Sequence, residues 1–349
     1  MTARCLISLG ANVGNRSQAI EGALRELAAH REVQVLCSSR LRETLPVGGP
    51  FGQAAFLNAA ALLETSLGPA ELLALFLRIE AESGRKRDVR WGPRPLDLDM
   101  LLFDDVVLAG SSLILPHPRM AWRRFVLEPA AEIAPDMMHP GIGWSIARLL
   151  EHMNTTQHYL AITGSIGAGK TELGGRMAAQ EAARLVSEEI DLTQLEGFYA
   201  NPASRAWPVE LEFLHQRSRL LAAGAGIWQD RPKPAVSDFW FDQSAAFARV
   251  WLAPEQYAEF EAHFEAARRT VVQPRLVVQL EATGQQLHER VLRRGRVCER
   301  RLTADELHQI ALAIDQQTRR PDVGPVLRIR SDNPDAAFEE VSAAFSAMA

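Results

Sequence analysis

Cysteine is scarce in this sequence, and no apolar run in it is long. The three cysteines, Cys5, Cys37 and Cys298, are far apart, odd in number and without metal-ligand spacing, so we expect structural thiols in a reducing compartment. The apolar run from Cys5 ends at Gly10, which is too short for a signal-peptide core, and no segment approaches the roughly 20 apolar residues of a membrane span. We therefore expect a soluble, cytoplasmic protein without a membrane partner.

Positive charge is not in excess either. Lys and Arg number 38 against 43 Asp and Glu, and the net charge of −5 gives no sign of a nucleic-acid partner. An anionic small molecule would need local basic clusters instead. The length of 349 residues exceeds the size, about 250–300 residues, at which a single hydrophobic core stops growing. We therefore expect two globular domains.

The pattern of secondary structure changes near residue 155. Before it, strand-like runs at 4–9, 33–39, 56–63 and 97–103 alternate with helical stretches at 17–30 and 69–83, which favours an α+β sandwich. After a polar segment come a strand, a glycine-rich loop, amphipathic helices and another apolar strand, which favours an α/β fold with a parallel sheet. We predict a domain at 1–153, a linker at 154–157 and a domain at 158–349.

The segment 90–99 is the most informative part of the first half. Asp97 and Asp99 stand two apart in a predicted strand, so both carboxylates point to one face. Two such oxygen ligands suit Mg²⁺ bound to a polyphosphate, and the alternative is a solvated polar face of an edge strand. The neighbouring side chains are Arg85, Arg87, Arg90, Trp91 and Arg94. Cations beside paired carboxylates favour a site that binds a metal ion and a phosphate chain together.

Other segments extend this pattern along the first half. They are residues 8–15, 44–48, 56–60 and 116–120, then Arg123 with Phe125, and finally 132–135. In this order the motifs resemble those of the 6-hydroxymethyl-7,8-dihydropterin pyrophosphokinases. The resemblance implies a ferredoxin-like α+β fold. It also implies that ATP and 6-hydroxymethyl-7,8-dihydropterin give AMP and the pterin pyrophosphate in folate biosynthesis.

The resemblance to the pyrophosphokinases also implies roles for individual residues. Asp97 and Asp99 would hold two Mg²⁺ ions between the phosphates and the attacking hydroxyl, and Arg85 and Arg94 would take part in catalysis. The pterin pocket would be formed by Thr44, Val47, Asn58, Trp91, Arg123 and Phe125. ATP would be contacted by Glu80, Arg94 and His117.

A second phosphate-binding motif opens the second half. The segment 164–171, Gly-Ser-Ile-Gly-Ala-Gly-Lys-Thr, directly follows a predicted strand and begins a helix. In this motif the glycines, Gly164, Gly167 and Gly169, let backbone N–H groups face the phosphates of ATP. Lys170 reaches the β- and γ-phosphates, and Thr171 is a ligand of one Mg²⁺ ion. The sequence therefore predicts an ATP site here.

The segments that follow the glycine-rich loop are 198–202, 212–217 and 290–296 with Glu299. They resemble the substrate helices and the arginine lid of the deoxynucleoside kinases, which implies a P-loop nucleoside kinase fold and ATP-dependent 5′-phosphorylation of a deoxynucleoside. The implied lid residues are Arg290, Arg294 and Arg296, with Arg290 also catalytic. Glu188, or its neighbour Glu189, would be the base for the sugar hydroxyl. A homodimer through this domain is also implied.

The sequence departs from the kinase pattern at the nucleoside site. The Asp-Arg-Ser motif expected at the third strand has two candidate registers, Asp230 and Asp238, of which we favour Asp238. Phe239 then replaces the expected arginine, with Arg231 and Arg249 as candidates to substitute in space. Glu210 stands where a glutamine usually reads the base, and an ionised acid cannot donate a hydrogen bond. These departures favour alternatives: a nucleotide-binding regulatory or assembly module, or a kinase for another small molecule.

Overall fold

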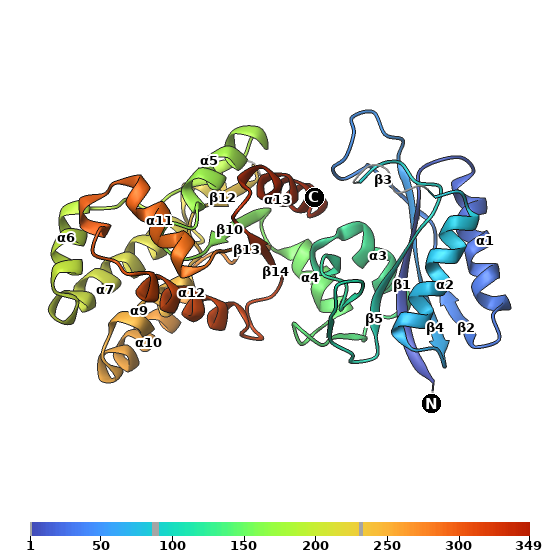
Figure 1. The fold of residues 1–349 in the computed structure, drawn as a ribbon, viewed down its shortest axis with the longest axis horizontal. Helices are drawn as coiled ribbons and strands as arrows, with labels where there is room; N and C mark the ends of the chain where they lie inside the picture. The colour runs from blue at the N-terminus through green and yellow to red at the C-terminus, as the bar shows by residue number, and fades with distance from the viewer. Residues whose placement is uncertain (1, 86–90, 230–232) are drawn as a thin grey trace. The chain divides into compact units, whose positions relative to one another are not determined.

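The computed structural model describes residues 2–85, 91–229 and 233–349, and the chain divides into two units. One comprises Met1–Thr155 with Ala343–Ala349, and the other comprises Thr156–Ser342 (Figure 1). Four residues singled out above, Arg87, Arg90, Asp230 and Arg231, lie outside the described residues.

The first unit is built on an antiparallel sheet of order β2-β4-β1-β5, with β3 paired to β4. The strands are β1 (Ala3–Ala11), β2 (Val33–Ser38), β3 (Arg42–Thr44), β4 (Phe56–Thr65) and β5 (Asp97–Phe103). Figure 1 shows α1 (Arg16–Ala29) and α2 (Pro69–Glu82) on one side of the sheet and α3 (Arg124–Ile133) and α4 (Ile146–Thr155) on the other. The short elements are β6 (Leu108–Ala109), β7 (Ile114–Leu115), η1 (Met120–Trp122), β8 (Met138–His139) and β9 (Trp144–Ser145).

Local sequence explains how α2 begins and which face it buries. Pro69 occupies the first turn, where its fixed φ suits a helix, and the Glu71 side chain accepts the Gly68 N–H at 2.8 Å. Leu72, Phe76 and Ile79 recur with helical spacing and are fully buried in the core of this unit. A ferredoxin-like class for this arrangement stays a prediction.

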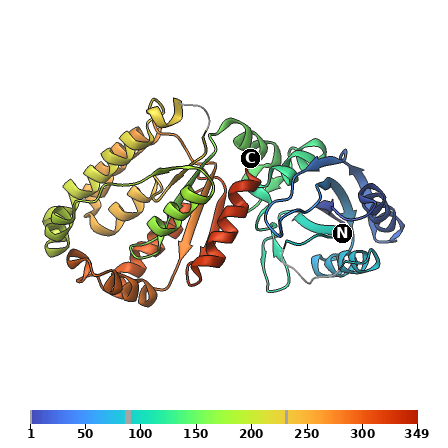
Figure 2. The same ribbon diagram turned by 90° about the horizontal axis from the view of Figure 1, so that it is seen from above.

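The second unit is built on a parallel sheet of order β11-β12-β10-β13-β14. The strands are β10 (Tyr159–Thr163), β11 (Arg184–Val186), β12 (Ala235–Ser237), β13 (Leu276–Glu281) and β14 (Val326–Arg330). Helices lie on both faces of the sheet (Figure 2), which explains why every residue of β10 is buried. The α/β fold with a parallel sheet is therefore confirmed. Since all strands run the same way, their carboxyl ends meet at one edge, where ligands bind in such folds.

The longer helices of the second half are α5 (Lys170–Gln180), α6 (Leu192–Ala200), α7 (Pro202–Leu221), α9 (Gln243–Trp251), α10 (Pro254–Arg268), α11 (Gly284–Arg294), α12 (Ala304–Thr318) and α13 (Pro334–Ala347). Two short helices, α8 (Gly226–Gln229) and η2 (Val297–Glu299), complete the set in the described residues. The predicted linker 154–157 begins inside α4, which ends at Thr155.

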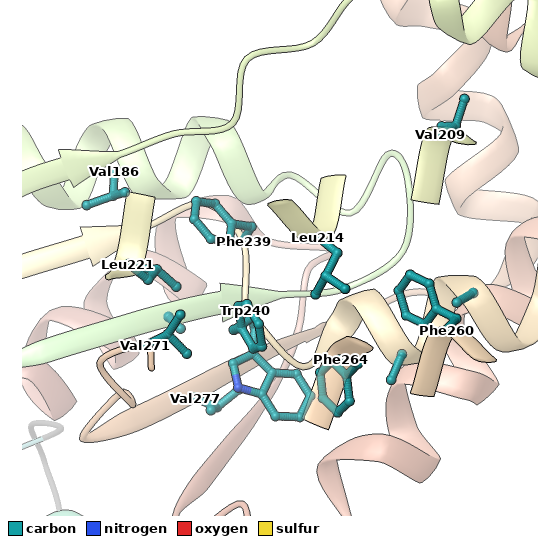
Figure 3. Packing of buried hydrophobic residues seen from close by; sticks show 14 of the residues in the cluster. Val186, Val209, Leu214, Leu221, Phe239, Trp240, Phe260, Phe264, Val271 and Val277 are labelled. Atoms are coloured by element: carbon teal, nitrogen blue, oxygen red, sulfur yellow. The ribbon is translucent and has the colours of Figure 1, made fainter. Parts of the chain in front are cut away.

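Several large aromatic side chains are buried in the core of the second unit. The segment after β12 contributes Phe239, Trp240 and Phe241, each at most 1% exposed. Phe241 stacks on Phe264 of α10, with ring centroids 5.6 Å apart. Figure 3 shows Phe239 and Trp240 among the aliphatic side chains of neighbouring elements. The residue that replaces the expected arginine is thus a core residue. In the described part of the chain, no helix is both long and apolar enough to span a membrane.

Candidate active sites

The two aspartates of the first unit lie at the start of β5. In the register between β5 and β1, Asp97 is opposite Gly10 and Asp99 is opposite Ser8. Both aspartates line one cavity, as residues two apart on a strand must if they face the same side. The described residues contain no group of three or more His, Cys, Asp or Glu placed to hold a metal ion.

A network of ion pairs surrounds Asp97. Arg85 pairs with both Asp97 and Glu80, and Arg94 pairs with Asp97. Burial and the neighbouring Asp99 raise the pKa of Asp97, while Arg94 and Arg85 oppose this shift. Glu80 is 3% exposed, accepts the Leu98 N–H at 2.9 Å and is not among the residues that line the cavity. Glu80 therefore contacts the backbone of β5 and the Arg85 side chain from outside the cavity.

The residues predicted to hold the pterin line the same cavity. They are Thr44, Val47, Asn58, Trp91, Arg123 and Phe125. Asn58 is 7% exposed, and its Nδ2 donates to Thr44 Oγ1 at 2.8 Å. The Arg123 guanidinium lies 5.6 Å from the centre of the Phe125 ring. This wall therefore combines a fixed amide with an aromatic face.

His117 also lines this cavity, on the segment after β7. Burial lowers the pKa of His117 to about 3, and Arg123 and Arg119 add to this effect. The Arg119 backbone N–H donates to His117 Nδ1 at 3.2 Å, so the hydrogen of the neutral ring is on Nε2. Arg119 lines the cavity as well, although we assigned it no role from the sequence. The available signal is that Arg119 lies within the segment 116–120 that resembles a pyrophosphokinase motif.

Two loops of the first unit meet at Trp91. Gln53 Nε2 donates to the Trp91 carbonyl at 3.0 Å, and Asn12 Oδ1 accepts the Arg94 N–H at 2.7 Å. A Cβ atom on Gly49 would lie 2.2 Å from the Trp91 carbonyl oxygen, so only glycine permits this approach. The sequence alone indicates no role for Gln53 or Asn12, because their hydrogen-bond partners are distant along the chain.

In the second unit, the glycine-rich loop joins β10 to α5. Lys170 Nζ donates to the carbonyls of Gly164 and Ser165 at 2.8 and 3.0 Å. Burial lowers the pKa of Lys170 to about 8, and Glu188 and Asp238 oppose this shift. The lysine side chain thus folds back over its own glycine-rich loop.

The carboxyl edge of the sheet opens into a cavity of about 350 Å³. The predicted residues that line it are Gly167, Lys170, Thr171, Glu188, Glu210, Asp238, Arg294 and Arg296. Of the two candidate bases, Glu188 lines this cavity, whereas the exposed Glu189 side chain is not among its lining residues. Burial raises the pKa of Asp238, and a hydrogen bond from the Thr171 hydroxyl opposes the shift. Asp238, the register that we favoured, therefore lines this cavity, while Asp230 lies outside the described residues.

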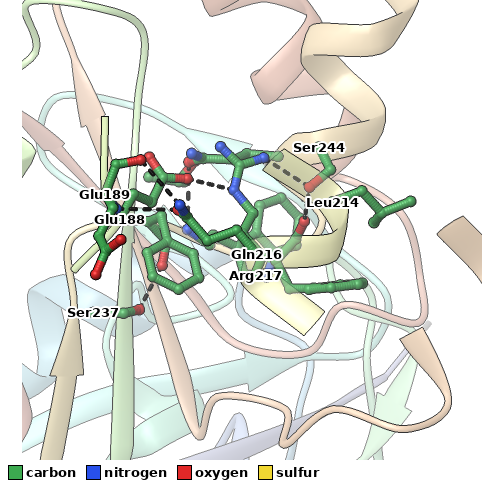
Figure 4. A network of polar contacts seen from close by, with 12 residues as sticks. Glu188, Glu189, Leu214, Gln216, Arg217, Ser237 and Ser244 are labelled. Carbon is green, nitrogen blue, oxygen red and sulfur yellow. Dashed lines mark hydrogen bonds and ion pairs between the residues drawn. The ribbon is translucent and has the colours of Figure 1, made fainter. Parts of the chain in front are cut away.

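Arg217 forms a contact that we did not foresee from the sequence. Its Nε pairs with Glu188 Oε1, and its Nη1 donates to Ser244 Oγ at 2.7 Å (Figure 4). Arg249, one of the two candidates to replace the missing arginine, donates to the Tyr257 hydroxyl at 2.9 Å and is not among the residues that line the cavity. The sequence does not indicate the pair of Arg217 and Glu188, because these residues come from elements that only the tertiary fold brings together.

Glu210 and Arg217 are two helical turns apart on α7 and face the same cavity. Glu210 is 3% exposed, and burial raises its pKa to about 8, an effect that Arg217 opposes and Glu188 increases. Glu210 is therefore mostly protonated at neutral pH and can both donate and accept a hydrogen bond.

The three arginines predicted to form a lid separate into two groups. Arg294 and Arg296 line the cavity and pair with Glu299, which is 2% exposed. Arg290 does not line it, and donates instead to the Ser331 hydroxyl and carbonyl at 2.7 and 2.6 Å. Tyr199 also lines the cavity, and burial followed by the charge of Glu299 raises its pKa. Sequence reasoning assigned no role to Tyr199, although it lies within a motif of the substrate helices.

A glycine-rich loop after the central strand, with lysine, acids and arginines around one cavity, gives the second unit the arrangement of a P-loop nucleotide-binding fold. Residues 160–346 match the deoxynucleoside kinase family, and residues 6–135 match the 7,8-dihydro-6-hydroxymethylpterin-pyrophosphokinase family. The chain therefore belongs to both families, with one domain of each.

Similar proteins agree with this assignment of the first domain. The 2-amino-4-hydroxy-6-hydroxymethyldihydropteridine pyrophosphokinase of Synechocystis is 38% identical over 177 residues, which are 50% of this chain and 86% of that protein. The Bacillus subtilis protein of the same name is 50% identical over 127 residues, which are 36% of this chain and 75% of that protein. Among solved structures, one similar to the second domain is deoxyadenosine kinase from M. mycoides with bound dATP, at 14% sequence identity. The match covers 52% of this chain and 96% of the kinase chain, with a TM-score of 0.46.

Proposed function

We propose that the chain is a bifunctional transferase. The first domain transfers pyrophosphate from ATP to 6-hydroxymethyl-7,8-dihydropterin, and the second transfers a phosphoryl group from ATP to the 5′-hydroxyl of a deoxynucleoside. The observation that carries the first activity is a single cavity lined by Asp97, Asp99, Asn58 and Phe125, in a domain of the pyrophosphokinase family. The second rests on Glu188 and Lys170 lining one cavity in a domain of the deoxynucleoside kinase family.

The first site fits Mg²⁺. Asp97 and Asp99 offer hard oxygen ligands on one face, and the pKa of Asp97 is raised by burial and by Asp99, a charge repulsion that a cation would relieve. Magnesium in such sites takes one or two carboxylates and completes its shell with phosphate oxygens and water. When bound there, Mg²⁺ ions would neutralise the polyphosphate charge.

The protein's own groups in the first site would then position the two substrates. Arg85 and Arg94, already beside Asp97, would contact the phosphate chain. Asn58 would hydrogen-bond the edge of the pterin while Phe125 stacks on its ring, and Arg123 and Trp91 would close over the substrates. The neutral His117 would donate from Nε2 to ATP. Positioning and charge neutralisation carry most of the catalysis in reactions of this type.

In the second site, Glu188 would accept the proton of the sugar hydroxyl as that oxygen attacks the γ-phosphate. The backbone of the glycine-rich loop and Lys170 would hold the phosphates, and Thr171, beside Asp238, would be a ligand of Mg²⁺. Arg294 and Arg296 would clamp the transferring group. Arg290 is held at Ser331 and would act from the edge of the site.

A panel of substrates tests both activities on the full chain with ATP and Mg²⁺. We expect AMP with hydroxymethyldihydropterin, and ADP with a nucleoside monophosphate for at least one deoxynucleoside. The replacement of the expected arginine by Phe239 favours an alternative for the second domain, a nucleotide-binding regulatory or assembly module. That alternative predicts ATP binding with no monophosphate from any deoxynucleoside. ADP released with another small-molecule acceptor would instead indicate a kinase of different specificity.

A further inference from the structure

The second site has an acid in the position of the base but has lost the arginine expected beside it. Phe239, the residue found there, is fully buried, so its phenyl ring fills the place with an apolar group. A carboxylate at the edge of such an aromatic cluster needs a cation or hydrogen-bond donors to stay in one orientation. Glu188 has such a cation, supplied by Arg217 from a different element, α7.

Arg217 is held at several points and cannot move freely. It is 4% exposed, and its guanidinium lies 5.4 Å from the centre of the Phe213 ring and 5.9 Å from that of Phe239. Its Nη1 donates to Ser244 Oγ at 2.7 Å, and the single Ser244 hydroxyl hydrogen goes to the Phe241 carbonyl at 2.8 Å. The ring of Phe239 therefore forms part of the wall against which Arg217 lies.

The other cations of the site have other partners. Lys170 donates to its own loop, and Arg294 and Arg296 pair with Glu299. Among the described residues, Arg217 is the one cation that forms an ion pair with Glu188. This pair engages Oε1 of the carboxylate, and Oε2 is the oxygen that a substrate hydroxyl would meet.

The backbone beside Glu188 is held from the same helix. Gln216 Nε2 donates to the Glu189 carbonyl at 3.0 Å, and the Glu189 N–H donates to Gln216 Oε1 at 3.1 Å (Figure 4). On α7, Gln216 thus binds the main chain of Glu189, and the next residue, Arg217, binds the carboxylate of Glu188.

We propose that Arg217 is the positioning residue for the catalytic base, in place of the arginine that Phe239 has displaced. The Arg217 guanidinium orients the Glu188 carboxylate toward the sugar hydroxyl and is itself oriented by Ser244. This inference rests on the proposed kinase function, because it gives Glu188 the role of base. It predicts that Arg217 acts on the rate through Glu188 and not independently of it.

A double-mutant cycle on the full chain tests this inference, with Arg217→Met, Glu188→Gln and both together. We expect Arg217→Met to lower kcat about 100-fold, the scale of a misplaced reacting group, with little change in the KM for ATP. In the Glu188→Gln background the same substitution should lower kcat by less than about 3-fold, because the effects of residues that act as a unit are not additive. Arg217→Lys, which keeps the charge, should restore part of the activity. Arg219→Met is the matched control, since this exposed side chain of α7 pairs with Glu212.

Three results would overturn the inference. Arg217→Met with near wild-type kcat shows that Arg217 does not position the base, and a loss that adds in full to that of Glu188→Gln indicates a separate structural role. If Arg217→Met does not fold, the cycle is run with Arg217→Lys, whose loss must likewise vanish in the Glu188→Gln background. A wild-type chain that binds ATP but phosphorylates no deoxynucleoside contradicts the proposed function itself. That last result is distinct from the others, in which the wild type is active.

Discussion

Asp97 is the residue on which opposing electrostatic influences meet in the first domain. Burial and Asp99 raise its pKa, and the ion pairs with Arg94 and Arg85 lower it. In the proposed reaction such a carboxylate would exchange its arginine partners for a metal ion when the substrates bind. The two aspartates should therefore be needed for chemistry more than for folding.

We expect Asp97→Ala and Asp99→Ala each to lower pterin pyrophosphorylation by a factor of at least about 100, since each removes a group that organises transition-state charge. AMP release measures the rate, and circular dichroism checks the fold. Asp105→Ala, an exposed aspartate just after the same strand, is the control and should be neutral. A rate near that of the wild type in either variant would contradict the assignment of these aspartates.

Glu210 offers a second test at the level of one residue. Its pKa of about 8 keeps it mostly neutral at pH 7, and it ionises as the pH rises through 8. A neutral carboxylic acid and an amide both donate and accept, so Glu210→Gln should keep the KM for the nucleoside within about 3-fold at pH 7. Above pH 8 the wild-type acid loses its donor while the amide does not, so the two KM values should diverge.

KM measured in both proteins between about pH 7 and about pH 9, one unit either side of the transition, checks this expectation. Glu212→Gln, on an exposed part of α7, is the control for adding an amide to this helix. A parallel pH dependence for wild type and Glu210→Gln would show that the Glu210 proton plays no part in reading the base.

At the scale of elements, the second site depends on how closely the glycine-rich loop packs against α11. A Cβ atom on Gly167 would lie 3.0 Å from the Leu287 carbonyl oxygen and 3.1 Å from Val291 Cγ2. The φ of Gly167 is +82°, a region that residues with a Cβ rarely adopt. Helix α11 and the glycine-rich loop therefore share one contact surface, and the loop cannot take a larger residue at this position.

Gly167→Ala should displace the loop from α11 and weaken ATP binding in the second domain at least tenfold, with a stability cost of roughly 1–2 kcal/mol from the positive φ. Titration calorimetry with ATP should lose one class of site while the class in the first domain remains. Gly175→Ala is the matched control, because this glycine lies within α5 with nothing within 4 Å of an added Cβ. It should leave ATP binding intact and stabilise the helix by up to about 1 kcal/mol. Equal effects of the two substitutions would exclude the contact with α11 as the cause.

At the scale of the whole molecule, each unit has its own hydrophobic core and its own cavity. The core of the first is centred on β1, β4 and α2, and that of the second on the aromatic residues after β12. Domains with separate cores can retain activity when the other is inactivated. The resemblance to deoxynucleoside kinases also implies a homodimer, which light scattering on the purified chain would test.

Lys170→Ala should abolish phosphoryl transfer in the second domain, because it removes the lysine that holds the phosphates, and should leave AMP release with hydroxymethyldihydropterin unchanged. Asp97→Ala should show the converse. Both activities are assayed on the same preparation of the full chain. Loss of the pterin reaction in a folded Lys170→Ala protein would mean that the two sites are coupled.

The sequence by itself determined the parts whose physical cause is local. Strand alternation placed Asp97 and Asp99 on one side, and the spacing of Gly164, Gly169 and Lys170 after an apolar strand indicated a phosphate loop before any tertiary contact was known. The order of the motifs indicated two domains of two families, and the matches at 6–135 and 160–346 confirm this.

Only the tertiary structure decided which side chains meet inside the second site. Whether Glu188 or Glu189 faces the cavity depends on how β11 ends against α7, and the pairing of Glu188 with Arg217 joins residues 29 positions apart. The Arg290 side chain is bound by Ser331, which is 41 positions away in the sequence, and does not line the cavity. Arg294 and Arg296, from the same segment of the chain, do line it. A local pattern sets the face on which a side chain lies, whereas its partner is set by the packing of whole elements, which depends on every residue of the core.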